Sequence, residues 1–140
     1  GEALSRKFCD KISNISSLLA SVEPYEKERV EKIRARIKDA LEKIAGVDYD
    51  KNRFEQELIF YIEKLDINEE KQRLTNHLDY FISTMNEGLG QGKKLGFIAQ
   101  EMGREINTLG SKANDADIQR IVVNMKDELE KIKEQLFNIL

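Results

Sequence analysis

The sequence of 140 residues contains a single proline, a single cysteine and no tryptophan. One proline and no tryptophan are typical of long solvated helices rather than of a compact sheet protein. A single cysteine, Cys9, excludes a disulfide bond within the chain and suits a reducing cytosol. No apolar run approaches the roughly 18 residues of a membrane-spanning helix, and no signal-peptide pattern is present. These absences predict a soluble cytoplasmic protein with no membrane partner.

Charged residues, in contrast, make up 35% of the chain, and the formal net charge is −3. This acidic balance argues against indiscriminate nucleic-acid binding, although a local basic patch can still bind RNA. Such a patch lies in residues 92–114, which contain Lys93, Lys94, Arg104 and Lys112 but two acidic residues, a local charge of +2. This stretch is where we first expect a polyanion.

Apolar residues recur at helical spacing along almost the whole chain, which predicts an all-α protein. In the first part they are Leu4, Phe8, Ile12, Ile15, Leu19 and Val22, followed after Pro24 by Val30, Ile33, Ile37, Leu41 and Ile44. Their register is nearly heptad across the proline, which predicts two stacked helices or one kinked helix; we favour a break near Glu23–Pro24. The residues Glu26–Arg29 are interpreted as an ordinary solvated face.

The remaining segments predict four further helices with apolar faces turned inward. Their inward residues are Phe54, Leu58, Tyr61, Ile62 and Leu65; Leu74, Leu78, Phe81, Ile82 and Met85; Leu95, Ile98, Met102 and Ile106; and Ile118, Ile121, Val122, Met125, Leu129, Ile132 and Leu136. Predicted helix caps are Gly46, Asp48 or Asp50, a capping box from Asp66 to Glu69, and Asn114 or Asp115. The predicted architecture is a single helical domain, 1–140, of long antiparallel helices (a hairpin or bundle) with a shorter central helix pair.

A glycine-rich loop, with Gly88, Gly90 and Gly92, comes directly before Lys93–Lys94. Its spacing is not that of a nucleotide-binding P-loop, and no strand is predicted before it. We therefore expect a flexible connection between two helices.

Two polar clusters lie beside the apolar stripes of neighbouring predicted helices. One cluster consists of Glu70, Arg73 and His77, and the other of Glu101, Arg104 and Glu105. If these faces adjoin, their carboxylates suit Mg²⁺ or Mn²⁺, their cations suit a phosphodiester, and the histidine can act as a general base. The alternative is that Glu70–Arg73 and Glu101–Arg104 are intrahelical ion pairs, worth a few tenths of a kcal/mol each.

Longer motifs in the chain resemble the bacterial YicC/YloC family. Its C-terminal signature is similar to GKKL at 92–95, QEM at 100–102, REINT at 104–108 and SK at 111–112. The same resemblance extends to QE at 56–57, DI at 66–67 with EE at 69–70, RL at 73–74 and HL at 77–78, and downstream to VV at 122–123, Lys126, EKI at 130–132 and EQ at 134–135. The opening GEAL at 1–4 is similar to the middle of that family's EGxxL segment. Two positions depart from the pattern: Gly96 stands where the family usually has an acid, and Gly103 where it often has asparagine.

The resemblance implies that this chain is the C-terminal helical region of a longer protein with an N-terminal α/β domain. It also implies a metal-dependent endoribonuclease that cleaves single-stranded RNA, assembles as a homo-oligomer and serves stress-related RNA turnover, with no DNA expected as a partner. The isolated helical region need not be active. Motif positions implied by the resemblance are Glu57, Asp66, Glu69, Glu70, Arg73, His77, Lys94, Glu101, Arg104, Glu105, Asn107 and Lys112.

Our leading hypothesis assigns three roles within these clusters. Catalysis is assigned to His77, Glu101, Arg104 and Glu105; a divalent metal, Mn²⁺ or Mg²⁺, to Glu70, His77, Glu101 and Glu105; and RNA contacts to Arg73, Lys93, Lys94, Arg104, Asn107 and Lys112. The rival hypothesis is a non-catalytic adaptor. In it the amphipathic segments 2–45 and 116–139 drive oligomerisation, and the basic stretch only docks RNA or a partner nuclease.

Overall fold

The computed structural model describes residues 2–44 and 50–139 and contains six helices within them. They are α1 (Glu2–Ala20), α2 (Val22–Lys43), α3 (Lys51–Leu65), α4 (Asn68–Met85), α5 (Gly92–Ala113) and α6 (Ala116–Ile139). The described residues form no strand, and the all-α prediction is confirmed. The central pair α3 and α4, of 15 and 18 residues, is the shortest, as expected. Within the same ranges, no helix is long and apolar enough to cross a bilayer.

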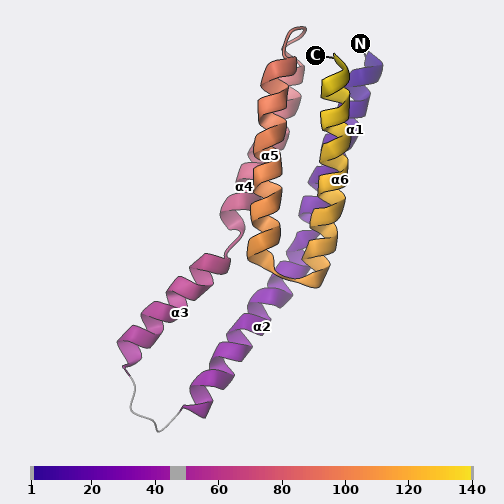
Figure 1. The fold of residues 1–140 in the computed structure, drawn as a ribbon. Coiled ribbons are helices and arrows are strands. Elements are labelled where there is room, and N and C mark those ends of the chain that lie inside the picture. Colours follow the sequence, from indigo (N-terminus) through magenta and orange to yellow (C-terminus); the bar gives the residue numbers. More distant parts are fainter. Residues whose placement is uncertain (1, 45–49, 140) are drawn as a thin grey trace.

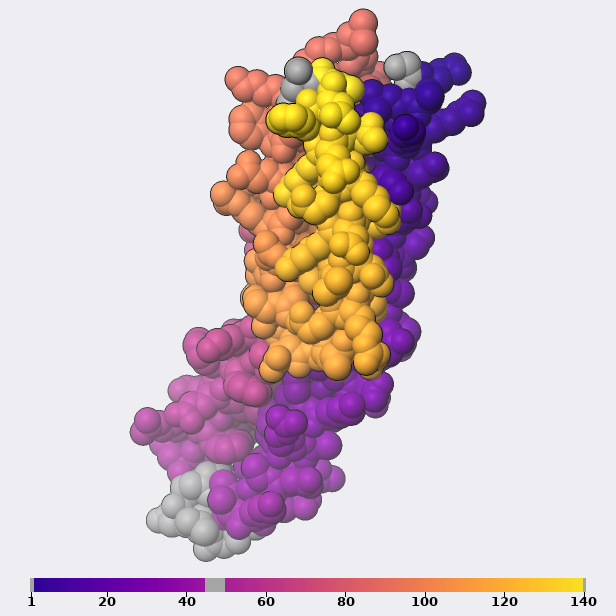
Figure 2. Space-filling model, turned by 45° about the vertical axis from the view of Figure 1, so that its right-hand side comes forward, coloured from indigo at the N-terminus to yellow at the C-terminus, as the bar shows by residue number. Residues whose placement is uncertain are grey.

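Four of the helices form a bundle that contains the core. Helix α4 packs on α5, α5 on α6, α6 on α1, and α1 on α4, which closes the ring. The two chain ends and the α4–α5 loop lie at one end of this bundle, and the α5–α6 connection lies at the other (Figure 1). Phe8 of α1 meets Phe81 of α4 edge to face, with ring centroids 5.5 Å apart. In the space-filling view, α6 covers the face between α5 and α1 (Figure 2).

The predicted stripes of α5 and α6 are confirmed because every residue of both is buried. Asn114 ends α5 in the left-handed region, with φ of 42°, and so reverses the chain. The Asp115 carboxylate then accepts hydrogen bonds from the backbone N–H groups of Asp117 and Ile118, each at 3.0 Å. These caps satisfy orphan backbone groups and join α5 and α6 as an antiparallel pair.

The first break in the chain falls at Ser21, slightly before the predicted position near Pro24. Ser21 keeps a right-handed helical backbone, with φ −70° and ψ −12°, so α1 and α2 form a kinked rod. Proline has no N–H to donate to the carbonyl four residues earlier, which here belongs to Ala20. The missing bond explains why α1 ends at that residue.

Helices α2 and α3 leave the bundle and form a projecting arm (Figure 1), which corrects one prediction. Val30, Tyr61 and Ile62 were expected to point inward but are exposed, and no residue of α3 is fully buried. The two helices diverge, leaving a hollow of about 540 Å³ whose walls include Ile33 and Ile62. Amphipathic spacing predicts which face is apolar, but it does not supply a partner for that face.

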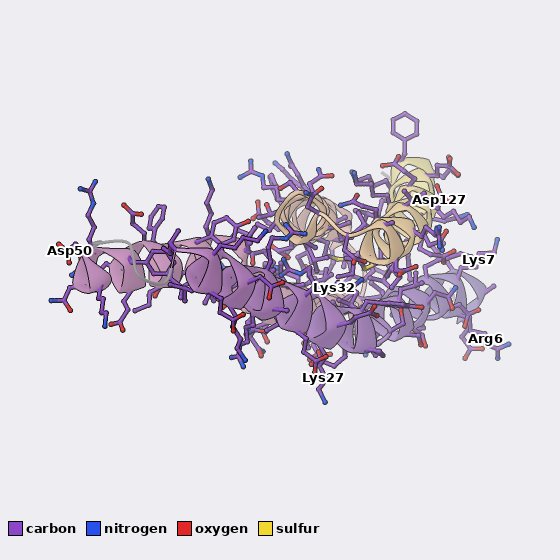
Figure 3. All side chains as sticks on the ribbon, turned by 90° about the horizontal axis from the view of Figure 1, so that it is seen from below. Arg6, Lys7, Lys27, Lys32, Asp50 and Asp127 are labelled. Atoms are coloured by element: carbon purple, nitrogen blue, oxygen red, sulfur yellow. The ribbon has the colours of Figure 1, made fainter. Side chains whose placement is uncertain are left out.

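The tip of the arm holds the start of α3. Asp50 lies at the tip of the arm, whereas Asp127 lies on α6 in the bundle (Figure 3). Asp50 caps α3, because its carboxylate accepts hydrogen bonds from the N–H groups of Asn52 and Arg53 at 3.1 and 3.2 Å. The cap predicted at Asp50 is therefore confirmed. Gly46 and Asp48 lie outside the described residues.

Glu26 and Arg29 were expected on a solvated face, but both are buried, so that interpretation is wrong for them. They continue the line of the buried Val22 at i+4 and i+7. The Arg29 guanidinium donates two hydrogen bonds of 2.9 Å to Glu26 and one of 2.6 Å to the backbone oxygen of Leu65. This pair ties α2 to the last residue of α3, at the base of the arm.

Candidate functional site

The two predicted polar clusters do adjoin, along the seam where α4 packs on α5; we call this seam, with Glu70, His77, Glu105 and Lys112, the groove. The His77 Nδ1 atom lies 2.7 Å from Glu105 Oε1. Two turns away, the Lys112 Nζ atom donates to Glu70 Oε1 at 2.9 Å. The condition on which the sequence hypothesis depended, that these two faces meet, is therefore met.

The pairing follows from matched spacing on two antiparallel helices. Glu70 and His77 are seven residues apart on α4, and Glu105 and Lys112 are seven residues apart on α5. Seven residues span two helical turns, about 10.5 Å along each axis. Because α5 runs back along α4, the first residue of one pair meets the second of the other.

Glu105 is the buried acid that contacts His77, with 6% of its surface exposed. Burial raises the pKa of the Glu105 carboxyl above its ordinary value of 4.5, and the nearby Glu101 adds to this effect. The hydrogen bond and charge of His77, together with the charge of Arg73, oppose the rise in pKa. The His77 side chain remains 28% exposed, so solvent reaches the pair from the imidazole side. A buried carboxylate that orients a reachable imidazole suits proton transfer.

Glu70 is the second buried acid, with 7% of its surface exposed. Lys112 neutralises it through Oε1, whereas its Oε2 atom is buried without a hydrogen-bond partner among the described residues. Lys112 was predicted to contact RNA. In this structure its ammonium group is engaged by Glu70, with 32% of its side chain exposed.

The exposed arginines beside the groove form pairs within their own helices. Arg73 pairs with Glu69 at 2.7 Å, so the predicted alternative partner, Glu70, is wrong. Arg104 pairs with Glu101 at 3.8 Å, as the ion-pair alternative anticipated. Exposed pairs of this kind contribute about 0.2–1 kcal/mol. Both guanidinium groups can therefore turn to a phosphate at little cost.

Other predicted positions lie at the edges of the groove or away from it. Glu57 pairs with Arg53 on α3 at 3.3 Å, in the arm. Asp66 accepts a hydrogen bond of 3.0 Å from the N–H of Asn68, the first residue of α4. The predicted capping box is wrong, because Ile67 is the N-cap residue and makes no side-chain cap hydrogen bond, and Glu69 pairs with Arg73 instead. Lys93 and Asn107 are exposed on α5.

Lys94 lies where α5 begins, near the loop that joins it to α4. Its Nζ atom is 5.2 Å from the centroid of the Tyr80 ring and 3.7 Å from Glu87 Oε2. Interaction with Tyr80, and then with Glu87, raises the pKa of the Lys94 ammonium group. Lys94 thus stays charged beside an aromatic ring that the sequence analysis did not single out.

The four predicted metal ligands are not assembled into one centre. Among the described residues, no three His, Cys, Asp or Glu side chains are grouped closely enough to hold a metal ion. Glu70 is turned to Lys112, and His77 contacts Glu105. Mg²⁺, however, is usually bound by one or two carboxylates together with water and substrate phosphates. Glu101 and Glu105, one turn apart on α5, fit that smaller role.

The fold and the groove define a class: an all-α protein whose bundle carries a partly buried His–Glu pair flanked by exposed cations. Comparison with known families is more specific. Residues 22–140 match the model of the family described as "Endoribonuclease YicC-like, C-terminal", and the chain belongs to this family.

Two curated relatives carry the name "Probable endoribonuclease YicC". One, from Clostridioides difficile, is 35% identical over 143 aligned residues, which cover 99% of this chain and 48% of the relative. The other, from Haemophilus influenzae, is 34% identical over 125 residues, which cover 89% of this chain and 41% of the relative. The chain thus spans a little under half the length of these relatives.

Proposed function

We propose that this chain is the C-terminal helical region of a longer endoribonuclease that cleaves single-stranded RNA, in homo-oligomeric form and in stress-related RNA turnover. The family match and the names of the relatives support the reaction class. The observation that carries the proposal for this chain is the contact of 2.7 Å between His77 and Glu105 in the α4–α5 groove. It supplies an oriented imidazole beside several cations.

In the proposed mechanism, His77 donates its Nδ1–H to the Glu105 carboxylate, which leaves Nε2 free to accept a proton. Nε2 takes a proton of the water that attacks the phosphorus atom, and Glu105 stabilises the imidazolium that results. The P–O bond to the leaving ribose oxygen breaks as the new P–O bond forms, the leaving oxygen takes a proton from solvent water, and the imidazolium returns its proton to solvent. The buried carboxylate also fixes the ring orientation, because Glu105 belongs to the core side of α5.

The cations of the groove would bind the substrate backbone. Arg73 and Arg104 can exchange their exposed carboxylate partners for phosphate oxygens, and a guanidinium binds phosphate in a bidentate manner. Mn²⁺ or Mg²⁺, held by Glu101 and Glu105 with the phosphate itself, would neutralise charge and lower the pKa of a bound water.

A second candidate, the adaptor, is favoured by the arm. Val30, Phe60 and Tyr61 are exposed there, and apolar side chains on one arm suit contact with another protein. The adaptor hypothesis used the segments 2–45 and 116–139 for assembly. Within them, α1 and α6 bury the apolar residues Phe8, Ile12, Ile15, Ile118, Met125 and Ile132 inside this chain's own bundle. In that reading, assembly would depend on the arm.

Cleavage of a labelled single-stranded RNA tests the proposal and separates the two candidates. The full-length protein and the 140-residue chain would each be incubated with Mn²⁺, Mg²⁺ or EDTA. Metal-dependent cleavage by this chain alone would assign the chemistry to the helices. Cleavage by the full-length protein only would give this region a supporting role, and RNA binding without cleavage by either would favour the adaptor.

A further inference from the structure

An exposed aromatic side chain lies one turn beyond the His77–Glu105 pair on α4. Tyr80 follows His77 by three residues, so the two lie on the same side of the helix, about 4.5 Å apart along its axis. Tyr80 is 45% exposed. Its ring faces the charged Lys94 from the neighbouring helix, at 5.2 Å.

A second exposed aromatic residue flanks the same lysine. Phe97 comes three residues after Lys94 on α5 and four before Glu101, and 60% of its surface is exposed. The three-residue spacing places Phe97 one turn from Lys94 on the same side of α5. The α4–α5 surface therefore combines aromatic rings and a cation next to the proposed catalytic pair.

This combination matches the chemistry of single-stranded nucleic acid. Unpaired bases stack on exposed aromatic rings, and a nearby cation binds the adjoining phosphate. The rise of about 4.5 Å from His77 to Tyr80 is on the order of the spacing between neighbouring nucleotides of one strand. A base one position from a phosphate held at His77 would thus reach the tyrosine ring.

Resting on the proposed function, we propose that Tyr80 and Lys94, extended by Phe97, form a subsite for the base and phosphate next to the scissile bond. Tyr80 stacks the base and Lys94 binds the phosphate. The bases of a duplex are stacked on one another and cannot reach the ring, so this subsite selects unpaired RNA.

The test compares binding of three labelled probes of equal length to the full-length protein: a single-stranded oligouridylate, the corresponding abasic ribose–phosphate strand, and an RNA duplex. The variants are Tyr80→Ala, Tyr80→Phe and Lys94→Ala. Phe137→Ala is the matched control, because Phe137 is an exposed aromatic residue on α6, which packs on α5 and α1. Far-ultraviolet circular dichroism and sedimentation would verify the fold and the assembly state of each variant.

We expect Tyr80→Ala to weaken binding of the single strand about 5- to 100-fold, with the abasic strand and the duplex nearly unchanged. Tyr80→Phe and Phe137→Ala should bind like the wild type. Lys94→Ala should weaken binding of the single strand and of the abasic strand to the same extent, because the Lys94 ammonium group binds phosphate, which both strands contain.

Three results would overturn the subsite. In the first, Tyr80→Ala binds the single strand as tightly as the wild type does. In the second, Tyr80→Ala weakens binding of the abasic strand as much as binding of the single strand. In the third, Tyr80→Ala changes only the assembly state, which would make the aromatic surface a protein contact. If the wild type binds RNA in these cases, the proposed function survives the loss of the subsite. If the wild type binds none of the probes, both proposals fail together.

Discussion

Removing the charge of Lys112 should destabilise the fold because it isolates a buried carboxylate. Glu70 is 7% exposed; Lys112 is the partner of its Oε1 atom, and Oε2 already has no partner among the described residues. Breaking a fully buried ion pair costs about 3–5 kcal/mol. Since the Lys112 side chain is 32% exposed, water screens part of this cost, and we expect Lys112→Met to lose about 1–3 kcal/mol. Methionine keeps the aliphatic part of the lysine side chain, so the loss in free energy of unfolding measures the effect of removing the charge.

The reverse change should cost far less. In Glu70→Leu, the partly exposed Lys112 ammonium can turn to water, so we expect a loss below about 1 kcal/mol. The double variant Glu70→Leu/Lys112→Met should also lie within about 1 kcal/mol of the wild type, because neither charge is left alone. Arg104→Met, which removes an exposed ion pair, is the control and should cost less than about 0.5 kcal/mol.

Urea unfolding followed by circular dichroism measures the free energies of unfolding of the wild type and the four variants at neutral pH. The asymmetry between the two single variants is the decisive quantity. A Lys112→Met variant as stable as the Arg104→Met control would refute the reasoning, and so would a double variant that loses as much as Lys112→Met alone.

Three further predictions follow from other parts of the structure. Burial raises the pKa of Glu105 above 4.5, so its contribution to stability is present at low pH and is lost as pH rises through that raised value. Glu105→Gln should therefore gain stability relative to the wild type between pH 4.5 and neutral pH, and a constant difference in urea unfolding across this range would contradict the pKa shift. Gly96→Ala should add about 0.5–1 kcal/mol, since nothing lies within 4 Å of the new Cβ atom. Gly110→Ala should show no such gain, because its Cβ atom would lie 3.1 Å from Val122; equal gains in thermal unfolding would disprove this difference.

Much of the bundle could be predicted from the sequence because α5 and α6 carry complete apolar stripes. The arm could not be distinguished from the bundle in this way, because α2 and α3 have apolar residues at the same helical spacing as the bundle helices. Tyr61 and Ile62 stand at the same kind of spacing as buried residues elsewhere, yet they are exposed where α2 and α3 diverge. Whether an apolar face is covered depends on the path of distant segments, which local periodicity does not contain.

The candidate site was predictable as two adjoining faces but not as pairs of atoms. On a helix, an arginine reaches acids at both i−3 and i−4, so sequence could not decide between Glu70 and Glu69 for Arg73. The pairing of His77 with Glu105 depends on the register of two helices joined by a loop. Tyr80 could not be identified as a site residue from the sequence, because an aromatic residue in an amphipathic helix is more often part of the core.

The central claim, that the His77–Glu105 pair performs the proton transfer, is tested most directly by His77→Ala in the full-length protein. The measurement is single-turnover cleavage of a labelled single-stranded RNA at saturating protein with Mn²⁺ or Mg²⁺, together with the Kd for the same RNA. We predict that cleavage slows by at least about 100-fold, as for loss of a general base, while the Kd changes by less than about threefold. Wild-type cleavage rates in His77→Ala would contradict the claim and move the chemistry elsewhere in the protein.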